Sequence, residues 1–195
     1  MVARKVTLDR DGAEVEQSPA AVFERGVMSS GEERIFLDVP DQHPDLLRRL
    51  CELLPPPFYV LYVLHTPRGE GEAGRYQSAE LSMDQLSAFL RRYSSYFYAD
   101  ARHDLWVYSI TSRQTLIWDR HNRLFAEGEP LGVVADALIS LGFTEGAVPP
   151  LGDHYHHYRS DFDDDATAVL AEFDWRRTPL RSEDEQRPPL SETVH

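Results

Sequence analysis

Three short apolar segments follow one another in LWVYSITSRQTLIWDRHNRLFAE, which is residues 105–127 of the chain. Residues 105–110, 116–119 and 123–127 each have a strand-like length, and the first two are rich in β-branched or aromatic side chains. The residues between them are too few to form a helix, and Asn122 suits a tight turn because it tolerates positive φ. The stretch predicts an antiparallel meander and argues against a doubly wound fold, which needs a helix after each strand.

The flanking sequence alternates between strand and helix patterns. Further strands are expected over residues 34–39, 58–65 and 75–81. Helices are expected after a cap at Asp41, after the capping box Ser82–Gln85 as far as about Tyr98, from Pro130 to Leu141, and over residues 166–173. This order predicts an α+β fold, with a mixed, largely antiparallel sheet and helices packed mainly on one face. We expect one domain over residues 1–181 and an extended, mobile tail over 182–195.

Composition narrows the classes of function. The chain has 20 Lys or Arg against 33 Asp or Glu, a formal net charge of −13, which opposes binding to nucleic acid. The single cysteine, Cys51, excludes an intramolecular disulfide and lies on an apolar helix face, where we expect it to be buried and un-ionised. The longest apolar run, residues 58–64, is far below the roughly 18–20 residues of a spanning helix. No secretory signal is evident, so a cytoplasmic protein is expected.

Familiar catalytic and cofactor motifs do not fit. Residues 69–74 match the glycine pattern of dinucleotide sites, but the next helix is expected only near Ser82, and Glu70 and Glu72 would repel phosphates. We therefore expect a solvated hairpin loop there. The chain has no nucleophile elbow and no phosphate-binding loop with Gly-Lys-Ser/Thr, so no cofactor is predicted.

The densest group of metal-ligating side chains is DHYHH, residues 153–157. In an extended segment, His154 and His156 face one side and can share a metal, with Asp161, Asp163 or a distant histidine completing the ligand set. Imidazole combined with carboxylate suits zinc, iron or manganese. The alternative is a segment whose His and Tyr side chains hydrogen-bond to the backbone and pack on a sheet edge.

Acidic side chains are concentrated in the same region. Residues 153–174 hold seven Asp or Glu and one Arg, a local charge of −6. Such a surface either serves solubility and helix capping or steers a positively charged protein. For the second role, the predicted contacts are Trp118, Asp119, His121, Asp161, Asp163 and Asp164.

Residues Leu116–Gly128, followed by Pro130–Phe143, resemble small bacterial proteins of the immunity type from polymorphic toxin systems. The shared pattern is a strand, a turn with Asp-x-His-Asn, a second strand that ends in Gly, and a helix. The resemblance carries over no catalytic residue. It implies a protein whose acidic face covers the active site of a basic toxin.

The leading hypothesis is a non-enzymatic, acidic cytoplasmic binding protein that inhibits a basic protein partner. The alternative is a metal-dependent enzyme that uses His154, His156 and a carboxylate, with zinc as the expected cofactor type. A third reading is a structural subunit that self-associates.

Overall fold

A large sheet dominates the fold, which we describe from a computed structural model covering residues 3–28 and 30–184. Its strand order is β10-β3-β4-β9-β8-β7-β5-β6-β12, and among these described strands only the β10–β3 pair is parallel. The strands are β3 (Val22–Val27), β4 (Glu33–Asp38), β5 (Phe58–Leu64), β6 (Gly74–Gln77), β7 (His103–Ser109), β8 (Gln114–Trp118), β9 (Arg123–Glu127), β10 (Thr144–Glu145) and β12 (Arg176–Thr178). The predicted mixed, largely antiparallel sheet is confirmed.

The predicted meander is the pairing of β7 with β8 and of β8 with β9. Asn122 has a φ of 60° in the turn between β8 and β9, which is the conformation expected of it. Alternate side chains of the meander point into the core. Leu105 lies opposite Trp118, which lies opposite Leu124, and all three are buried.

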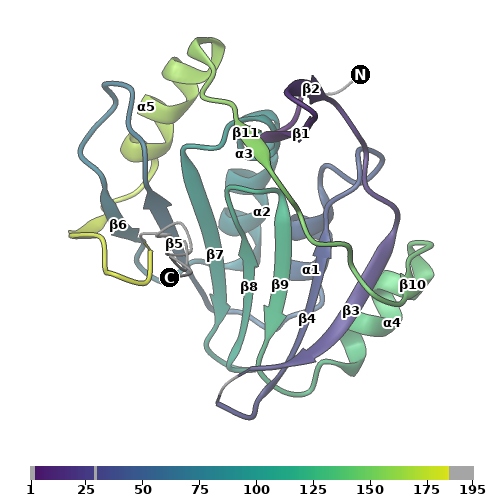
Figure 1. The fold of residues 1–195 in the computed structure, drawn as a ribbon. Coiled ribbons are helices and arrows are strands. Elements are labelled where there is room, and N and C mark those ends of the chain that lie inside the picture. Colours follow the sequence, from purple (N-terminus) through teal and green to yellow (C-terminus); the bar gives the residue numbers. More distant parts are fainter. Residues whose placement is uncertain (1–2, 29, 185–195) are drawn as a thin grey trace, which may run out of the picture.

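The helices cover one face of this sheet. Figure 1 shows α1, α2 and α3 behind the strands β4, β9, β8 and β7. The five described α-helices are α1 (Leu46–Cys51), α2 (Met83–Arg92), α3 (Ser94–Ala99), α4 (Gly132–Ser140) and α5 (Asp163–Glu172). None of the helices in residues 3–28 and 30–184 combines the length and the apolar character needed to cross a membrane.

Two helix predictions need correction. Ser82 caps α2 with the predicted capping box, but the helix does not continue to Tyr98; it ends at Arg92, and α3 begins after Tyr93. Asp41 does not cap α1, which begins after Asp45. The Asp41 carboxylate instead accepts hydrogen bonds from the side chains of Arg4 and Tyr98, contacts distant in sequence that a local pattern does not reveal.

A second, three-stranded sheet lies at the end of the large sheet that carries the β8–β9 turn (Figure 1). It consists of β11 (His154–His156), β1 (Val6–Arg10) and β2 (Ala13–Val15), with β1 in the middle and both pairs antiparallel. The predicted extended segment at residues 153–157 therefore exists as a strand. Its partner is the beginning of the chain.

The loop after β5 and the chain end also depart from expectation. Glu70 does not sit in solvent: its carboxylate is buried and lies 3.2 Å from Nη1 of Arg102. Asp184, in the predicted tail, is buried and pairs with Nη1 of Arg75 at 2.5 Å. The rest of the tail, residues 185–195, lies outside the described residues.

Candidate metal centre

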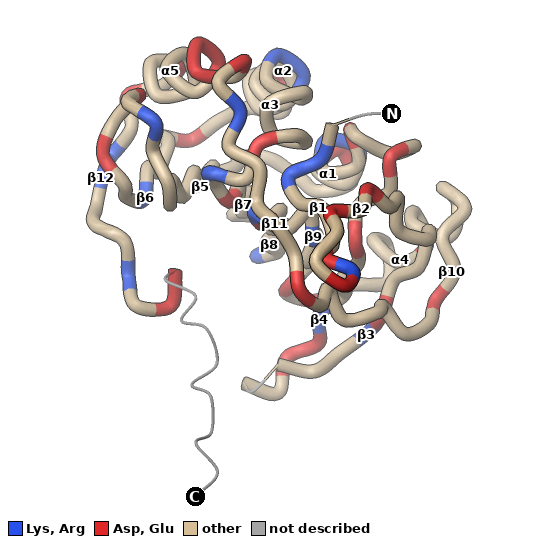
Figure 2. Tube along the Cα trace, turned by 45° about the horizontal axis from the view of Figure 1, so that its top comes forward, with Lys and Arg blue, Asp and Glu red and all other residues tan. Residues whose placement is uncertain are grey.

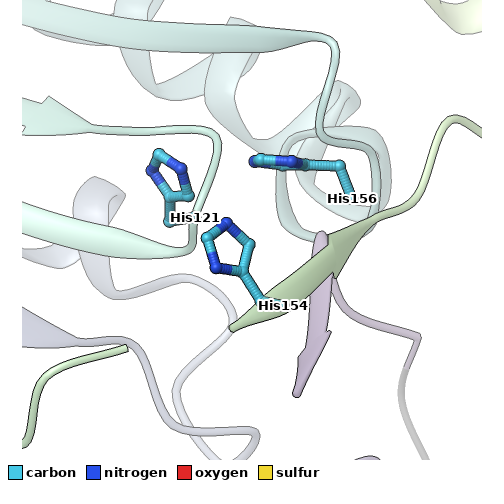
Figure 3. Close-up of side chains that lie close together, drawn as sticks. All are labelled: His121, His154 and His156. Carbon is cyan, nitrogen blue, oxygen red and sulfur yellow. The ribbon is translucent and has the colours of Figure 1, made fainter. Parts of the chain in front are cut away.

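Three imidazoles from the two sheets converge on one point. His121 comes from the β8–β9 turn, and His154 and His156 come from β11 (Figure 3). One ring nitrogen of each histidine can be chosen so that all three lie within 4.8 Å of one another. The ring centroids are 4.9 Å apart for His154 and His156, 4.9 Å for His121 and His156, and 5.1 Å for His121 and His154.

The turn itself orients His121. Oδ1 of Asp119 accepts hydrogen bonds from the backbone N–H groups of His121 and Arg123, both at 2.8 Å. Oδ2 of Asp119 lies 2.9 Å from Nδ1 of His121. Burial opposes ionisation of Asp119, but these hydrogen bonds and the His121 ring hold its pKa below the usual value. Because the Asp119 carboxylate binds Nδ1, the other ring nitrogen, Nε2, is left to bind a metal ion. This arrangement is common around metal-binding histidines.

Strand alternation and pairing with β1 place the other two rings. His156 lies opposite Val6 and His154 opposite Leu8. Tyr155, between them, points the other way and donates its hydroxyl hydrogen to Asp9. Nδ1 of His154 lies 2.9 Å from the carbonyl oxygen of Gly152, so this nitrogen is the N–H donor and Nε2 remains as the lone-pair site.

His156 is the member of the cluster that has a ring nitrogen without a hydrogen-bond partner. Its Nε2 is buried and forms no hydrogen bond within the described part of the chain. Burial, followed by the proximity of His121 and His154, lowers the pKa of His156 to about 3. The ring is therefore neutral near pH 7 and has a lone pair available to a metal. Buried polar atoms without a partner are uncommon and indicate a missing ligand or a functional role.

The chain after β11 is fixed by a buried ion-pair network. The carboxylate of Asp100 binds the Arg102 guanidinium at 2.9 Å and accepts the backbone N–H of Arg159 at 2.8 Å. Nη2 of Arg102 also reaches Asp163, at the start of α5, at 2.9 Å. Both Asp100 and Arg102 are fully buried. This network holds the segment between β11 and α5 against the large sheet.

The spacing of the donors suits a small metal ion. Tetrahedral zinc with Zn–N bonds of about 2.0–2.1 Å separates its ligand nitrogens by roughly 3.4 Å. The three ligand nitrogens lie within 4.8 Å of one another, so each pairwise separation would need to shorten by no more than about 1.4 Å to reach this value. Among the described residues the cluster contains no carboxylate, so three imidazole nitrogens are its whole donor set.

A cavity of about 190 Å³ borders the cluster at His121. Most of its lining is apolar, including Val6, Val22 and Pro149. Its charged side chains have partners within the chain: Arg4 pairs with Asp41, and Asp38 pairs with Arg123.

The structure brings together two of the three predicted metal ligands. His154 and His156 meet, but Asp161 is not part of the cluster, and its place is taken by His121. The sequence leaves a distant histidine open as the completing ligand, but His121 itself is assigned to the predicted partner contacts. The pattern Asp119-x-His121 was the available signal, because a carboxylate two residues before a histidine can bind its Nδ1 and orient the ring.

The predicted partner contacts differ in burial and in their contacts within the chain. Trp118 is only 3% exposed and donates its indole N–H to Asn122, so it is a core residue and the prediction of a surface contact is wrong. Asp119 is engaged by the turn, and Asp163 by Arg102 and Arg68. Asp161 and Asp164 are exposed.

No protein-family model matches the chain, and no curated protein or solved structure matches it significantly.

Proposed function

We propose that this protein binds one divalent transition metal, with zinc the best fit, through His121, His154 and His156. The observation that carries the proposal is the buried Nε2 of His156, which has no hydrogen-bond partner in the described chain and lies beside two other imidazoles. Coordination would satisfy this atom. Without a ligand, a neutral buried acceptor of this kind costs about 1–3 kcal/mol.

The donor set favours zinc over calcium or magnesium. Hard cations take oxygen ligands, whereas imidazole suits zinc, copper, iron and nickel. The d-electrons of zinc impose no geometric preference, and the ion accepts three histidines plus one further ligand, a set found in catalytic zinc sites. A bound zinc ion would supply a water molecule whose pKa is lowered to about 7.

The surrounding residues would support the metal in defined ways. Asp119 would fix the ring of His121 and increase the basicity of its Nε2. The Gly152 carbonyl would hold the tautomer of His154. Because His121 belongs to the large sheet and the other two ligands to the small sheet, the metal would also join the two sheets.

Competition titration of zinc against a chromogenic chelator tests the proposal. Replacement of any one of the three histidines, as in His156→Ala, is expected to weaken zinc binding by at least about tenfold, and Asp119→Asn by roughly 10–100-fold. His157→Gln is the matched control. His157 follows the same strand but faces the other way, toward Thr7 and Glu14.

The proposal fails if wild-type protein does not compete with the chelator. It also fails if His156→Ala and His157→Gln have the same affinity for zinc.

The exposed acidic side chains at the start of α5 support a second proposal, an interaction with a basic protein. Figure 2 shows Asp and Glu clustered at this helix end. Asp161 and Asp164 are exposed and form no ion pair within the described residues. If they steer a basic partner, the charge reversal Asp161→Lys/Asp164→Lys should abolish its capture from the source cell without changing zinc affinity. Equal capture by wild type and variant would contradict this second proposal.

A further inference from the structure

The face of the large sheet opposite the helices carries an aromatic surface. Register places Gln77, Leu61, Trp106 and Ile117 in one row across β6, β5, β7 and β8. A second row holds Tyr59, Tyr108 and Thr115. Directly opposed residues share a face of a sheet, so the two rows form one continuous surface. Large apolar side chains on a face with no covering helix indicate a binding surface.

This surface is hollowed. A groove of about 380 Å³ is lined by Tyr59, Leu61, Gln77, Trp106, Tyr108 and Thr115. Tyr108 is 36% exposed, so its ring is available at the rim. The indole Nε1 of Trp106 is buried and has no hydrogen-bond partner within the described part of the chain. The groove thus offers aromatic faces and one unused donor, which a ligand with a hydrogen-bond acceptor such as a carbonyl oxygen would satisfy.

The described chain ends at the border of this groove. Arg75 lies on β6 two residues before Gln77, and its guanidinium is 5.6 Å from the centre of the Trp106 ring. The same guanidinium pairs with Asp184 at 2.5 Å, and both side chains are buried. Asp184 also accepts the backbone N–H of Arg181 at 2.7 Å. Asp184 is therefore fixed close to Trp106.

The sequence that follows Asp184 has the composition of a ligand for such a groove. It reads EQRPPLSETVH and contains Pro188, Pro189 and Leu190. Proline-rich segments favour the polyproline II conformation, whose carbonyl groups are free and whose rings pack on Trp and Tyr. Pro188 is four residues beyond Asp184, a span of up to about 13 Å. That reach is sufficient for a segment that starts beside the groove.

We propose that the Tyr59–Trp106–Tyr108 groove is a docking site for a proline-rich segment and that its occupant is the chain's own Pro188-Pro189-Leu190. A carbonyl of this segment accepts the Trp106 indole N–H, and the proline rings pack on the aromatic faces. The net charge of −13 disfavours a second copy of the chain as occupant, because two such molecules repel each other. The short connection from Asp184 gives the chain's own segment a high effective concentration.

Indole ¹⁵N–¹H spectroscopy of the full chain tests this proposal. The three tryptophans give three indole signals, and Trp106→Phe identifies the one from Trp106. Trp118 and Trp175 serve as internal references, because their indole groups bind Asn122 and the Val169 carbonyl. The test variant is Pro188→Ala/Pro189→Ala, and the control is Glu192→Gln, which alters the same segment outside the prolines.

We expect the proline variant to shift the Trp106 signal and to leave the two reference signals in place, while Glu192→Gln shifts none of them. An unchanged Trp106 signal in the proline variant would overturn the proposal. A Trp106 signal that changes with protein concentration would also overturn it, because the occupant would then be a second copy of the chain.

Discussion

Arg102 is the single residue on which the region after β11 depends most. Its guanidinium is fully buried and binds Asp100, Asp163, Glu70 and the Arg159 carbonyl. Removing one member of a buried ion-pair network is strongly destabilising, because it leaves an uncompensated charge in the interior. The sequence did not suggest this role, since these partners are brought together only by the packing of three separate segments.

Arg102→Met is therefore expected to lower the free energy of unfolding by about 3–5 kcal/mol. Arg68→Met is the matched control. Arg68 contacts the same Asp163, but its side chain is 38% exposed, so its loss is expected to cost about 0–1 kcal/mol. Urea denaturation of both variants measures the difference. Similar losses in the two variants would show that burial of the Arg102 network does not matter.

Lys5 carries a buried amine beside the β8–β9 turn. Its Nζ lies 3.0 Å from the Asp119 carbonyl and packs 5.2 Å from the centre of the Trp118 ring. Burial lowers the pKa of Lys5 to about 8, against the attraction of nearby aspartates. In the unfolded chain the pKa returns to its ordinary value of 10.5.

The lowered pKa predicts a pH dependence of stability. Between about pH 8 and 10.5 the unfolded chain still binds the Lys5 proton, whereas the folded chain has lost it, so the free-energy cost of burying the charged amine is progressively removed as pH rises. Below pH 8 both states bind the proton. Relative to Lys5→Met, wild type should gain roughly 3 kcal/mol across this window. Urea denaturation at pH 7.5, 9 and 10.5 measures the gain, and a constant difference would refute the prediction.

Among the elements, those with local signals were predicted best. The capping box at Ser82, the buried face with Cys51, the meander at residues 105–127 and the strand at residues 58–64 follow from patterns within a few residues of one another. The break at Tyr93 and the contacts of Asp41 depend on packing between distant segments and gave no local signal.

Ser82 provides a test of the element that sequence predicted most sharply. Its side chain accepts the backbone N–H of Gln85, and the Gln85 side chain accepts the backbone N–H of Ser82. Ser82→Ala is expected to lower the free energy of unfolding by about 1 kcal/mol. Ser95→Ala, at an exposed position within α3, is the control and should change stability little. Thermal unfolding distinguishes the two variants, and equal stabilities would contradict the assigned capping role.

The strand β11 shows why the candidate site could be predicted only in part. Its alternation put His154 and His156 on one face, as the sequence suggested. The sequence could not decide among Asp161, Asp163 and a distant histidine as the third ligand. The choice depends on β11 pairing with β1, which lies about 150 residues earlier, and on the nearby β8–β9 turn. Asp161, the predicted third ligand, is carried away from the cluster by the segment that enters α5.

For the whole molecule, a metal at this site would connect the two sheets. A ligand that binds only the folded state stabilises it according to its free concentration, by about 2.7 kcal/mol at 100 times the dissociation constant. Zinc should therefore raise the melting temperature of wild type and of His157→Gln by similar amounts, and that of His156→Ala by clearly less. Differential scanning fluorimetry measures the shift. An equal shift in His156→Ala would place zinc elsewhere on the chain.

The most direct test of the metal centre is the zinc content of the purified protein after exposure to zinc and exhaustive dialysis. The three-histidine site predicts about one zinc ion per wild-type chain, the same content in His157→Gln, and little zinc in His121→Ala, His154→Ala or His156→Ala. Wild-type protein that retains no zinc, or a His156→Ala variant that retains as much as wild type, would contradict the account.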